Sequence, residues 1–272
     1  MTAAVTLRPP SAADILALWE RGQGRSAPAR ALLLLGYARP QWSAAQLRAA
    51  TVGQCEVALL ELRTRTFGPR MEVVGSCPSC GAMVEFTCDT RALALPPCPT
   101  AGPDTAAAQH ESTAPGLRVV FRLPTMGDLL ALAGGEGGSD GAADVGGEPG
   151  DRPAAGGGMA LISRCVVDVR DEKGNQLPAT PLPAEAEAAL ADRIAELDPG
   201  ADVTFAVSCI DCGGSWQPSL DMAGFLWREL SALARRLLHE VHVLASRYGW
   251  TEREILSLGA RRRRAYLEGA WA

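Results

Sequence analysis

The sequence predicts an α+β protein that is mainly helical, with a few short antiparallel strands and a small zinc ribbon. Apolar residues recur at helical spacing over much of the 272-residue chain, and short alternating runs interrupt them. Two C-x-x-C-G motifs, called knuckles below, lie far apart at residues 77–81 and 209–213, and each follows a β-prone run. Because two knuckles supply the four thiolates of a structural zinc site, we expect these distant segments to fold together.

The N-terminal segment, residues 1–70, is predicted to consist of helices. We expect them over about residues 11–21, 29–37 and 43–66, because apolar residues follow a helical period there. The first begins after a capping serine, and the third begins with a Ser-x-x-Gln capping box. A Gly-Pro pair at residues 68–69 ends the third helix.

Residues 71–90 and 202–220 are predicted to form the two halves of the ribbon, and residues 91–201 form an inserted region between them. Within that region, residues 134–158 contain eleven glycines, and Val145 is the only large apolar residue before the segment ends. Such a composition cannot bury enough apolar surface to order the chain. We therefore expect a disordered loop there and not a phosphate-binding site.

The rest of the inserted region is predicted to alternate between loop, strand and helix. Its abundant Pro, Ala and Thr favour a loop over residues 91–116, and β-branched residues favour a strand over residues 117–123. Helical periodicity and start signals favour helices over residues 125–132, 159–167 and 183–197.

A C-terminal helical segment, residues 221–272, contains the strongest helix signal in the chain. The helix is expected over residues 221–247, and Gly249 ends it. A capping box at residues 251–254 then begins a short helix. The long helix carries an apolar stripe made of Leu226, Leu230, Leu233, Leu237, Val241 and Leu244.

The knuckle cysteines are the candidate metal ligands. The preferred set is Cys77, Cys80, Cys209 and Cys212. A local set, in which Cys88 and Cys98 replace the second knuckle, and reduced cysteines without metal are the alternatives. Two matching knuckles favour the first set, because Cys88 and Cys98 lack the motif. A closed four-thiolate zinc site has no open coordination position, so it predicts a scaffold and not a zinc enzyme.

Catalytic chemistry finds little support in the sequence. A redox C-x-x-C motif should open a helix after a strand, but Gly and β-prone or Gly-rich residues follow each knuckle. Cys55 and Cys165 lie on apolar helical faces, where buried and inert thiols are expected. His239 and His242 lack an accompanying acidic ligand pattern, and no hydrolytic constellation is visible. We therefore predict that the protein is not an enzyme.

Charge and hydropathy restrict the possible partners. The formal net charge is −5, so no global positive field draws the chain to nucleic acid or anionic membrane. No run of about 18 apolar residues is present, and we see no secretory signal. We expect a cytoplasmic protein with no membrane insertion and no small-molecule substrate.

The sharpest charge feature is a run of four arginines near the end of the sequence. Because arginines beside aromatic side chains suit protein interfaces, we hypothesise a partner-binding surface there. A solvated helix end and a contact with nucleic-acid phosphates are the alternatives. The predicted surface comprises Trp250, Arg261, Arg262, Arg263, Arg264, Tyr266 and Trp271.

A second class of function also uses zinc ribbons. Nucleic-acid-binding or transcription-related modules often contain them, and the knuckles alone do not exclude such a role. The acidic balance of the chain and the lack of interleaved basic and aromatic residues near the knuckles argue against it.

Several segments resemble the T-even-type phage baseplate protein family, meaning the baseplate hub assembly proteins, with relatives in gene clusters of contractile tails and phage-tail-like injection systems. The shared ending is a long helix, an aromatic-Gly-Trp turn at residues 248–250, an E-I-L-x-L motif at residues 254–258 and a basic run at residues 261–264. Residues 59–68 and 121–129 also resemble members found in those clusters.

This resemblance implies a non-enzymatic baseplate component or hub assembly factor. Its partners would be baseplate, hub or spike proteins of the same apparatus, and it would reside in the cytoplasm or in an assembled tail-like particle. The family has no catalytic residues to carry over. The knuckles are not general to the phage proteins, so the zinc prediction depends on the cysteines of this chain.

Overall fold

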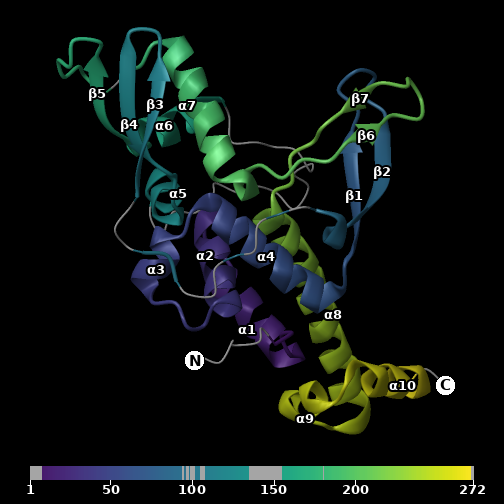
Figure 1. The fold of residues 1–272 in the computed structure, drawn as a ribbon. Coiled ribbons are helices and arrows are strands. Elements are labelled where there is room, and N and C mark those ends of the chain that lie inside the picture. The colour runs from purple at the N-terminus through teal and green to yellow at the C-terminus, as the bar shows by residue number, and fades with distance from the viewer. Residues whose placement is uncertain are drawn as a thin grey trace.

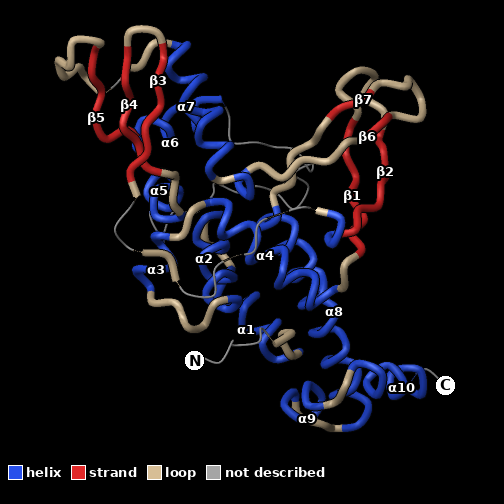
Figure 2. Tube along the Cα trace, in the orientation of Figure 1, coloured by secondary structure: helices blue, strands red, loops and turns tan. Residues whose placement is uncertain are grey.

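A helical body carries two β-containing arms at one end and a pair of short helices at the other (Figures 1 and 2). This arrangement confirms the predicted α+β class, in which helices dominate and the strands are short and antiparallel. The computed structural model describes residues 8–93, 95, 98, 102–104, 108–134, 155–179 and 181–270.

The helical body is built from four N-terminal helices and one long helix from the C-terminal segment. Its members are α1 (Ala12–Gly22), α2 (Ala27–Ala38), α3 (Ala44–Ala49), α4 (Val52–Phe67) and α8 (Met222–Tyr248). Helix α8 packs against α1, α2 and α4, so its apolar stripe becomes the centre of the core. Leu226, Leu230 and Leu237 are fully buried there, as the predicted stripe requires.

The ribbon arm projects from the junction of α4 and α8 (Figure 1). It contains two antiparallel pairs, and Val73 lies opposite Phe86 in one and Val207 opposite Trp216 in the other. The strands are β1 (Arg70–Ser76), β2 (Met83–Asp89), β6 (Val207–Ser208) and β7 (Ser215–Trp216), and the short helix η1 (Thr90–Ala92) follows β2.

The small-sheet arm has a hydrophobic core of its own. Its elements are β3 (Gln109–Ala114), β4 (Leu117–Arg122), β5 (Val166–Asp171), α6 (Ala155–Cys165) and α7 (Ala184–Leu197). Helix α5 (Met126–Leu132) follows β4 and packs on the helical body, where Met126 is buried in the core. The strand order is β3-β4-β5, and α7 packs against the sheet. Val119, Phe121, Val169 and Leu190 are buried between the sheet and α7.

Two short helices extend the far end of α8. Gly249, with φ of +69°, ends α8 in the left-handed conformation that glycine adopts without strain. Helix α9 (Glu252–Ser257) begins with the predicted Thr251 capping box, and α10 (Ala260–Ala270) packs back against α8. Trp271 lies outside the described residues.

The helix expected over residues 43–66 is two helices, α3 and α4. Thr51 begins α4 with a second capping box, in which the Gln54 backbone N–H donates to the Thr51 hydroxyl at 3.2 Å. The break between the helices also pairs with the start of α5. Val52 N donates to Pro124 O at 3.2 Å, and Met126 N donates to Ala50 O at 2.9 Å.

Parts of the inserted region also differ from expectation. The loop expected over residues 91–116 contains β3, which pairs with β4 along its whole length. The helix expected over residues 159–167 ends at Cys165, because the valines that follow pair with β4 as β5. Helix α6 starts within the glycine-rich segment, and residues 135–154 of that segment lie outside the described residues.

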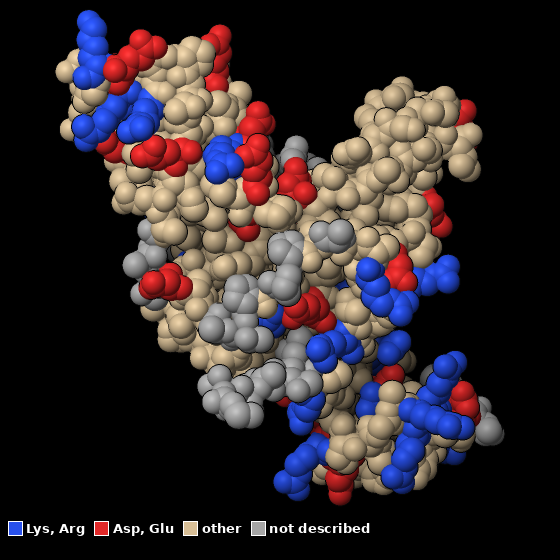
Figure 3. Space-filling model, in the orientation of Figure 1, with Lys and Arg blue, Asp and Glu red and all other residues tan. Residues whose placement is uncertain are grey.

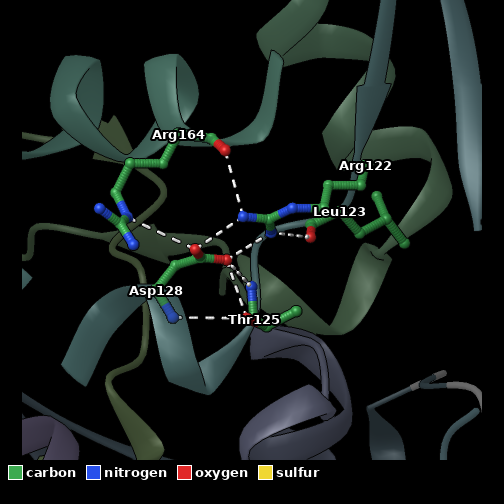
Figure 4. Close-up of polar contacts among 5 residues, drawn as sticks. All are labelled: Arg122, Leu123, Thr125, Asp128 and Arg164. Carbon is green, nitrogen blue, oxygen red and sulfur yellow. Dashed lines mark hydrogen bonds and ion pairs between the residues drawn. The ribbon is translucent and has the colours of Figure 1, made fainter. Parts of the chain in front are cut away.

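A buried carboxylate joins the small-sheet arm to the helical body (Figure 4). Asp128 in α5 accepts a hydrogen bond from Arg122 Nη2 at 2.8 Å and forms an ion pair with Arg164 Nε at 3.4 Å. The same carboxylate caps α5 by accepting from the Thr125 backbone N–H at 3.1 Å. Burial alone raises the pKa of Asp128, but the hydrogen bonds from Arg122 and Thr125 outweigh it and lower the pKa to about 2.

We predict that Asp128→Asn lowers the free energy of unfolding by about 2 kcal/mol at neutral pH, because hydrogen bonds to a charged partner are lost. The pKa of Asp128 is lowered on folding, so its contribution is present above the usual carboxyl range and is lost as the pH falls toward 2. Urea unfolding of both proteins measures the difference.

Asp89→Asn is the matched control for this prediction. Asp89 also has a pKa lowered to about 2 by hydrogen bonds from Arg91, but that pair is exposed and local. Its replacement should change the unfolding midpoint much less, since surface ion pairs contribute little. Equal effects of the two substitutions would contradict the assigned role of Asp128.

Candidate metal centre

Four cysteine side chains converge at the tip of the ribbon arm. Cys77 and Cys80 lie between β1 and β2, Cys209 and Cys212 lie between β6 and β7, and the four Sγ atoms are all within 4.8 Å of one another. The Sγ distances Cys77–Cys212 and Cys80–Cys209 are both 3.7 Å. Thiolates bound at about 2.3 Å to a tetrahedral zinc ion would lie about 3.8 Å apart. The donors therefore fit zinc in number, chemistry and spacing.

The two knuckles have the same backbone geometry. Cys77 O accepts from Gly81 N at 2.8 Å, and Cys209 O accepts from Gly213 N at 3.0 Å. Both glycines have positive φ, +74° and +71°, which side chains with a Cβ rarely adopt. The glycine in each C-x-x-C-G motif therefore closes a tight turn that aims two cysteines at one point.

The knuckle thiols differ in how readily they ionise. Burial raises the pKa of Cys77, but backbone N–H groups of Ser79 and Cys80 stabilise its thiolate and lower the pKa to about 7. The Ala82 N–H favours the Cys80 thiolate in the same way, yet the neighbouring thiols outweigh it and raise the pKa of Cys80 to about 12. Four adjacent thiolates repel one another, so a cation is required to hold them all ionised.

A small apolar cluster supports the thiols from below. Cys77 and Cys209 are buried against Val84 and Val207, whereas Cys80 and Cys212 are exposed. Phe86 and Phe205 pack nearby, with ring centroids 6.1 Å apart. This cluster is small, and Met71 and Val73 of β1 are buried instead in the core of the helical body, with Phe86 packed against both.

Arg63 fixes the position of the ribbon on the helical body. Its Nε and Nη2 atoms donate to the two carboxylate oxygens of Glu229 in α8 at 2.9 and 2.7 Å. Its Nη1 atom donates to the carbonyl oxygens of Gly68 and Arg70 at 2.7 and 2.8 Å, and the side chain is only 4% exposed. One guanidinium therefore links α4, α8 and the start of β1.

Glu56 holds the start of α8, just after the second ribbon half. Its Oε2 atom accepts from the Met222 backbone N–H at 2.8 Å, and the neighbouring Asp221 caps Gly224 N at 2.9 Å. Burial of the carboxyl group and the charge of Asp221 raise the pKa of Glu56 to about 8. Glu56 is therefore largely protonated at neutral pH.

The remaining candidate ligands lie apart from this cluster. Cys98 Sγ donates to Gln54 O at 3.4 Å, and burial raises the pKa of both Cys88 and Cys98. Among the described residues, the knuckle cysteines form the one group of three or more metal-binding side chains within reach of a shared ion. His239 and His242 are exposed on α8.

The predicted partner residues do not all face solvent. Arg261, Arg262 and Arg264 are exposed, but Arg263 is 6% exposed and donates to Glu240 of α8 at 2.8 Å. Its Nη1 atom also donates to Leu258 O at 2.6 Å. Arg263 therefore holds α10 on α8. In the sequence, Tyr266 and Leu267 follow Arg263 by three and four residues, which places all three on one face of the helix. This spacing is the signal that could have predicted that Arg263 packs inward.

Two of the predicted aromatic residues, Trp250 and Tyr266, form a cluster with Tyr248, which was not predicted. Tyr248 stacks on Trp250 with ring centroids 4.8 Å apart, and Trp250 meets Tyr266 edge-on at 4.8 Å. The Tyr248 hydroxyl donates to Tyr266 O at 3.2 Å. Tyr266 lies in α10, the helix that also carries the exposed arginines, and Figure 1 shows α9 and α10 at the end of α8 away from the ribbon arm.

Residues 43–222 match the family model described as T4 bacteriophage base plate protein. The chain belongs to this family. The match begins at the N-cap of α3 and ends at the first residue of α8, so it includes both knuckles and the small sheet. Neither a curated protein nor a solved structure matches the chain.

Membership of the base plate family confirms the resemblance found in the sequence. Residues 59–68 and 121–129 lie within the matched range, whereas the ending at residues 248–264 lies beyond it. The family match therefore covers the ribbon and Arg63, whereas Glu229 and the predicted partner surface lie beyond it. No helix among the described residues has the length and apolar character needed to cross a membrane.

We predict that raising the pH from about 5 to 8 lowers the free energy of unfolding of the wild-type protein more than that of Glu56→Gln. The ordinary pKa of a glutamate carboxyl group is 4.5, whereas the pKa of Glu56 in the folded protein is about 8. Between these values the folded state retains a proton that the unfolded state loses. Stability therefore falls as the pH rises through this window. Urea unfolding with saturating zinc at each pH measures it.

Glu254→Gln is the control for the Glu56 experiment. Backbone and hydroxyl hydrogen bonds from Thr251 lower the pKa of Glu254, so its titration lies below the tested window. This variant should retain the wild-type pH slope between pH 5 and 8. An unchanged slope in Glu56→Gln would show that Glu56 does not titrate there.

We predict that the double substitution Cys209→Ser with Cys212→Ser abolishes zinc binding and loosens residues 71–90 as well. Two ligands would remain, and the first ribbon half would lose its partner. Metal analysis of the purified protein measures the first effect, and amide hydrogen exchange measures the second. The matched control is Cys88→Ser with Cys98→Ser, which should retain zinc. Retention by the knuckle variant and loss by the control would move the site to the local set.

Proposed function

We propose that this protein is a non-enzymatic component or hub assembly factor of the baseplate in a contractile phage-tail-like injection system. Protein–protein contacts would carry its function, and a structural zinc ion would hold its two ribbon halves together. The observation that most supports this proposal is that the base plate family match spans the segments that bring the four cysteines together. Its partners would be baseplate, hub or spike proteins of the same apparatus.

The donor set supports zinc as a structural ion. Cys77, Cys80, Cys209 and Cys212 would be the ligands, and the bound ion would supply a cross-link between two distant segments. Four protein ligands leave no position for water or substrate. The residues themselves bind and orient the ion, while the apolar cluster beneath Cys77 and Cys209 excludes water from the inner side.

The charge of the ribbon argues against a nucleic-acid-binding module. Lys and Arg are absent from residues 71–90 and from residues 194–227, which include both ribbon halves. The exposed charges there are acidic, as at Glu72, Glu85 and Asp211. A surface that contacts phosphates needs cations, so a ribbon of this charge repels nucleic acid. A salt-dependent gel shift with DNA or RNA tests this alternative.

The end formed by α9 and α10 is the proposed partner surface. Arg261, Arg262 and Arg264 are exposed beside Trp250 and Tyr266, and arginine with aromatic side chains is a composition typical of interface hot spots. Arg263 contributes indirectly, by holding α10 in place through Glu240.

We predict that replacing Arg261, Arg262 and Arg264 together by Ser weakens assembly with baseplate proteins but leaves the thermal unfolding midpoint nearly unchanged. These side chains are exposed, so the fold does not depend on them. Affinity purification of the tagged variant from its native host, followed by mass spectrometry, measures the recovered partners. Recovery of partners equal to that of wild type would show that these arginines do not contribute to the interface.

Arg263→Ser is the matched comparison. It leaves Glu240 without its buried cation, so it should lower the unfolding midpoint by several degrees. The same purification with the wild-type protein tests the function as a whole. Recovery of sheath, tube, spike or other baseplate proteins supports the proposal, and recovery of polymerase subunits or nucleic acid contradicts it.

A further inference from the structure

The β1–β2 hairpin has an outer face that no part of the described chain covers. Beyond Arg70 at the base of β1, the side chains that alternate outward are Glu72, Val74 and Ser76 on β1 and Met83, Glu85 and Thr87 on β2, and all six residues are exposed. Val74 is opposite Glu85, and Met83 is opposite Ser76, so the two apolar residues are diagonal neighbours on one face. Val74 is 37% exposed and Met83 is 55% exposed.

The second knuckle adds a further exposed apolar side chain at the tip of the arm. Ile210 is 92% exposed and is followed by the exposed Asp211. Isolated exposed apolar residues are normal on protein surfaces. Ile210, however, lies between two proposed zinc ligands in a turn of fixed geometry. Because the backbone there is already ordered, a partner that binds the Ile210 side chain would lose little further backbone entropy.

The ribbon arm beyond Arg70 is also acidic, because residues 71–90 and 194–227 contain no Lys or Arg. Glu72, Glu85 and Asp211 form no ion pair with a described residue. A zinc ion bound by four thiolates would add a net charge of about −2 to the tip. Figure 3 shows this arm almost without basic atoms on the visible face. We call Glu72, Val74, Met83, Glu85, Ile210 and Asp211 the ribbon face.

The opposite end of the molecule has the complementary chemistry. Figure 3 shows basic side chains gathered over α9 and α10, at the far end of α8 from the ribbon. Arg261 and Arg262 are exposed and form no ion pair with a described residue, and Tyr248, 37% exposed, belongs to the aromatic cluster beside them. We call Tyr248, Trp250, Arg261, Arg262 and Tyr266 the C-terminal face.

We propose that the ribbon face of one molecule binds the C-terminal face of a second copy of this chain. The carboxylates of one face would meet the arginines of the other, and Val74, Met83 and Ile210 would pack against the aromatic cluster. The two faces lie at opposite ends of one molecule, so they cannot meet within a single chain (Figure 1). The proposal deepens the proposed function and rests on its structural zinc and its C-terminal partner surface.

This contact would be heterologous, since two different surfaces meet. Heterologous contacts form closed rings when the rotation between neighbours closes and open chains when it does not. Each molecule would offer one free face after the first contact, so association would grow with protein concentration. Because charges carry much of the recognition, it would also weaken as salt is added.

The test uses two variants of the full-length zinc-loaded protein, each with one damaged face. The ribbon variant carries Glu85→Gln, Ile210→Ser and Asp211→Asn, and the tail variant carries Arg261→Glu with Arg262→Glu. Light scattering after gel filtration, over about 1 to 100 µM protein, measures the molar mass. We expect wild type to form higher-mass species that dissociate with salt, and each variant alone to be monomeric.

Mixing the two variants is the decisive measurement. The intact C-terminal face of the ribbon variant should bind the intact ribbon face of the tail variant, so the mixture should give a 1:1 dimer that grows no further. Glu172→Arg, an exposed charge change on the small-sheet arm, is the control and should assemble like wild type. Zinc content and circular dichroism of each variant verify that the fold is intact.

Two outcomes would overturn the inference. One is a wild-type protein that remains monomeric at every concentration, and the other is a mixture of folded variants that gives no dimer. Assembly of either variant alone would likewise assign the contact to another face. The purification of host partners by the wild type is independent of these results, so a monomeric protein that recovers baseplate components would retain the proposed function and lose only this inference.

Discussion

The buried guanidinium of Arg63 holds α4, α8 and β1 at one junction, and the geometry of the ribbon depends on that junction. The two ribbon halves are separated by the inserted region, and they meet because one continues α4 and the other leads into α8. Fork-like pairing with Glu229 fixes the helices, while the carbonyls of Gly68 and Arg70 fix the exit of the chain toward the first knuckle. The helical body thus brings the four thiols within reach of one ion.

Apolar burial around the knuckles is small, so a bound ion would matter more there than elsewhere in the fold. Cys77 and Cys212 are 135 residues apart, and closing a chain loop of about 100 residues removes roughly 4 to 5 kcal/mol of unfolded-state entropy. When the ribbon alone opens, the folded helical body still restricts much of that freedom, which reduces this amount. The ion would then act locally, by fixing the knuckles and the side chains they present.

Local signals allowed the sequence to predict much of the fold and the cysteine cluster. The knuckle motif predicts both the ligands and the turn. Ser11, Ser43 and Thr251 each predict a helix start that the structure contains. The errors arose where long-range pairing decided the structure. The polar β3 is a strand because β4 pairs with it, and no local pattern identified Arg63 among the many arginines of the chain.

The separate core of the small-sheet arm has a consequence for how the protein opens. Phe121 and Leu190 pack among neighbours of their own, and polar links such as Asp128 and the contact of Asp198 with Gly53 join this arm to the body. Such an arrangement divides the molecule into cooperative units of unequal stability. The arm can therefore unfold and refold as a unit while the helical body, and the ribbon attached to it, stay folded.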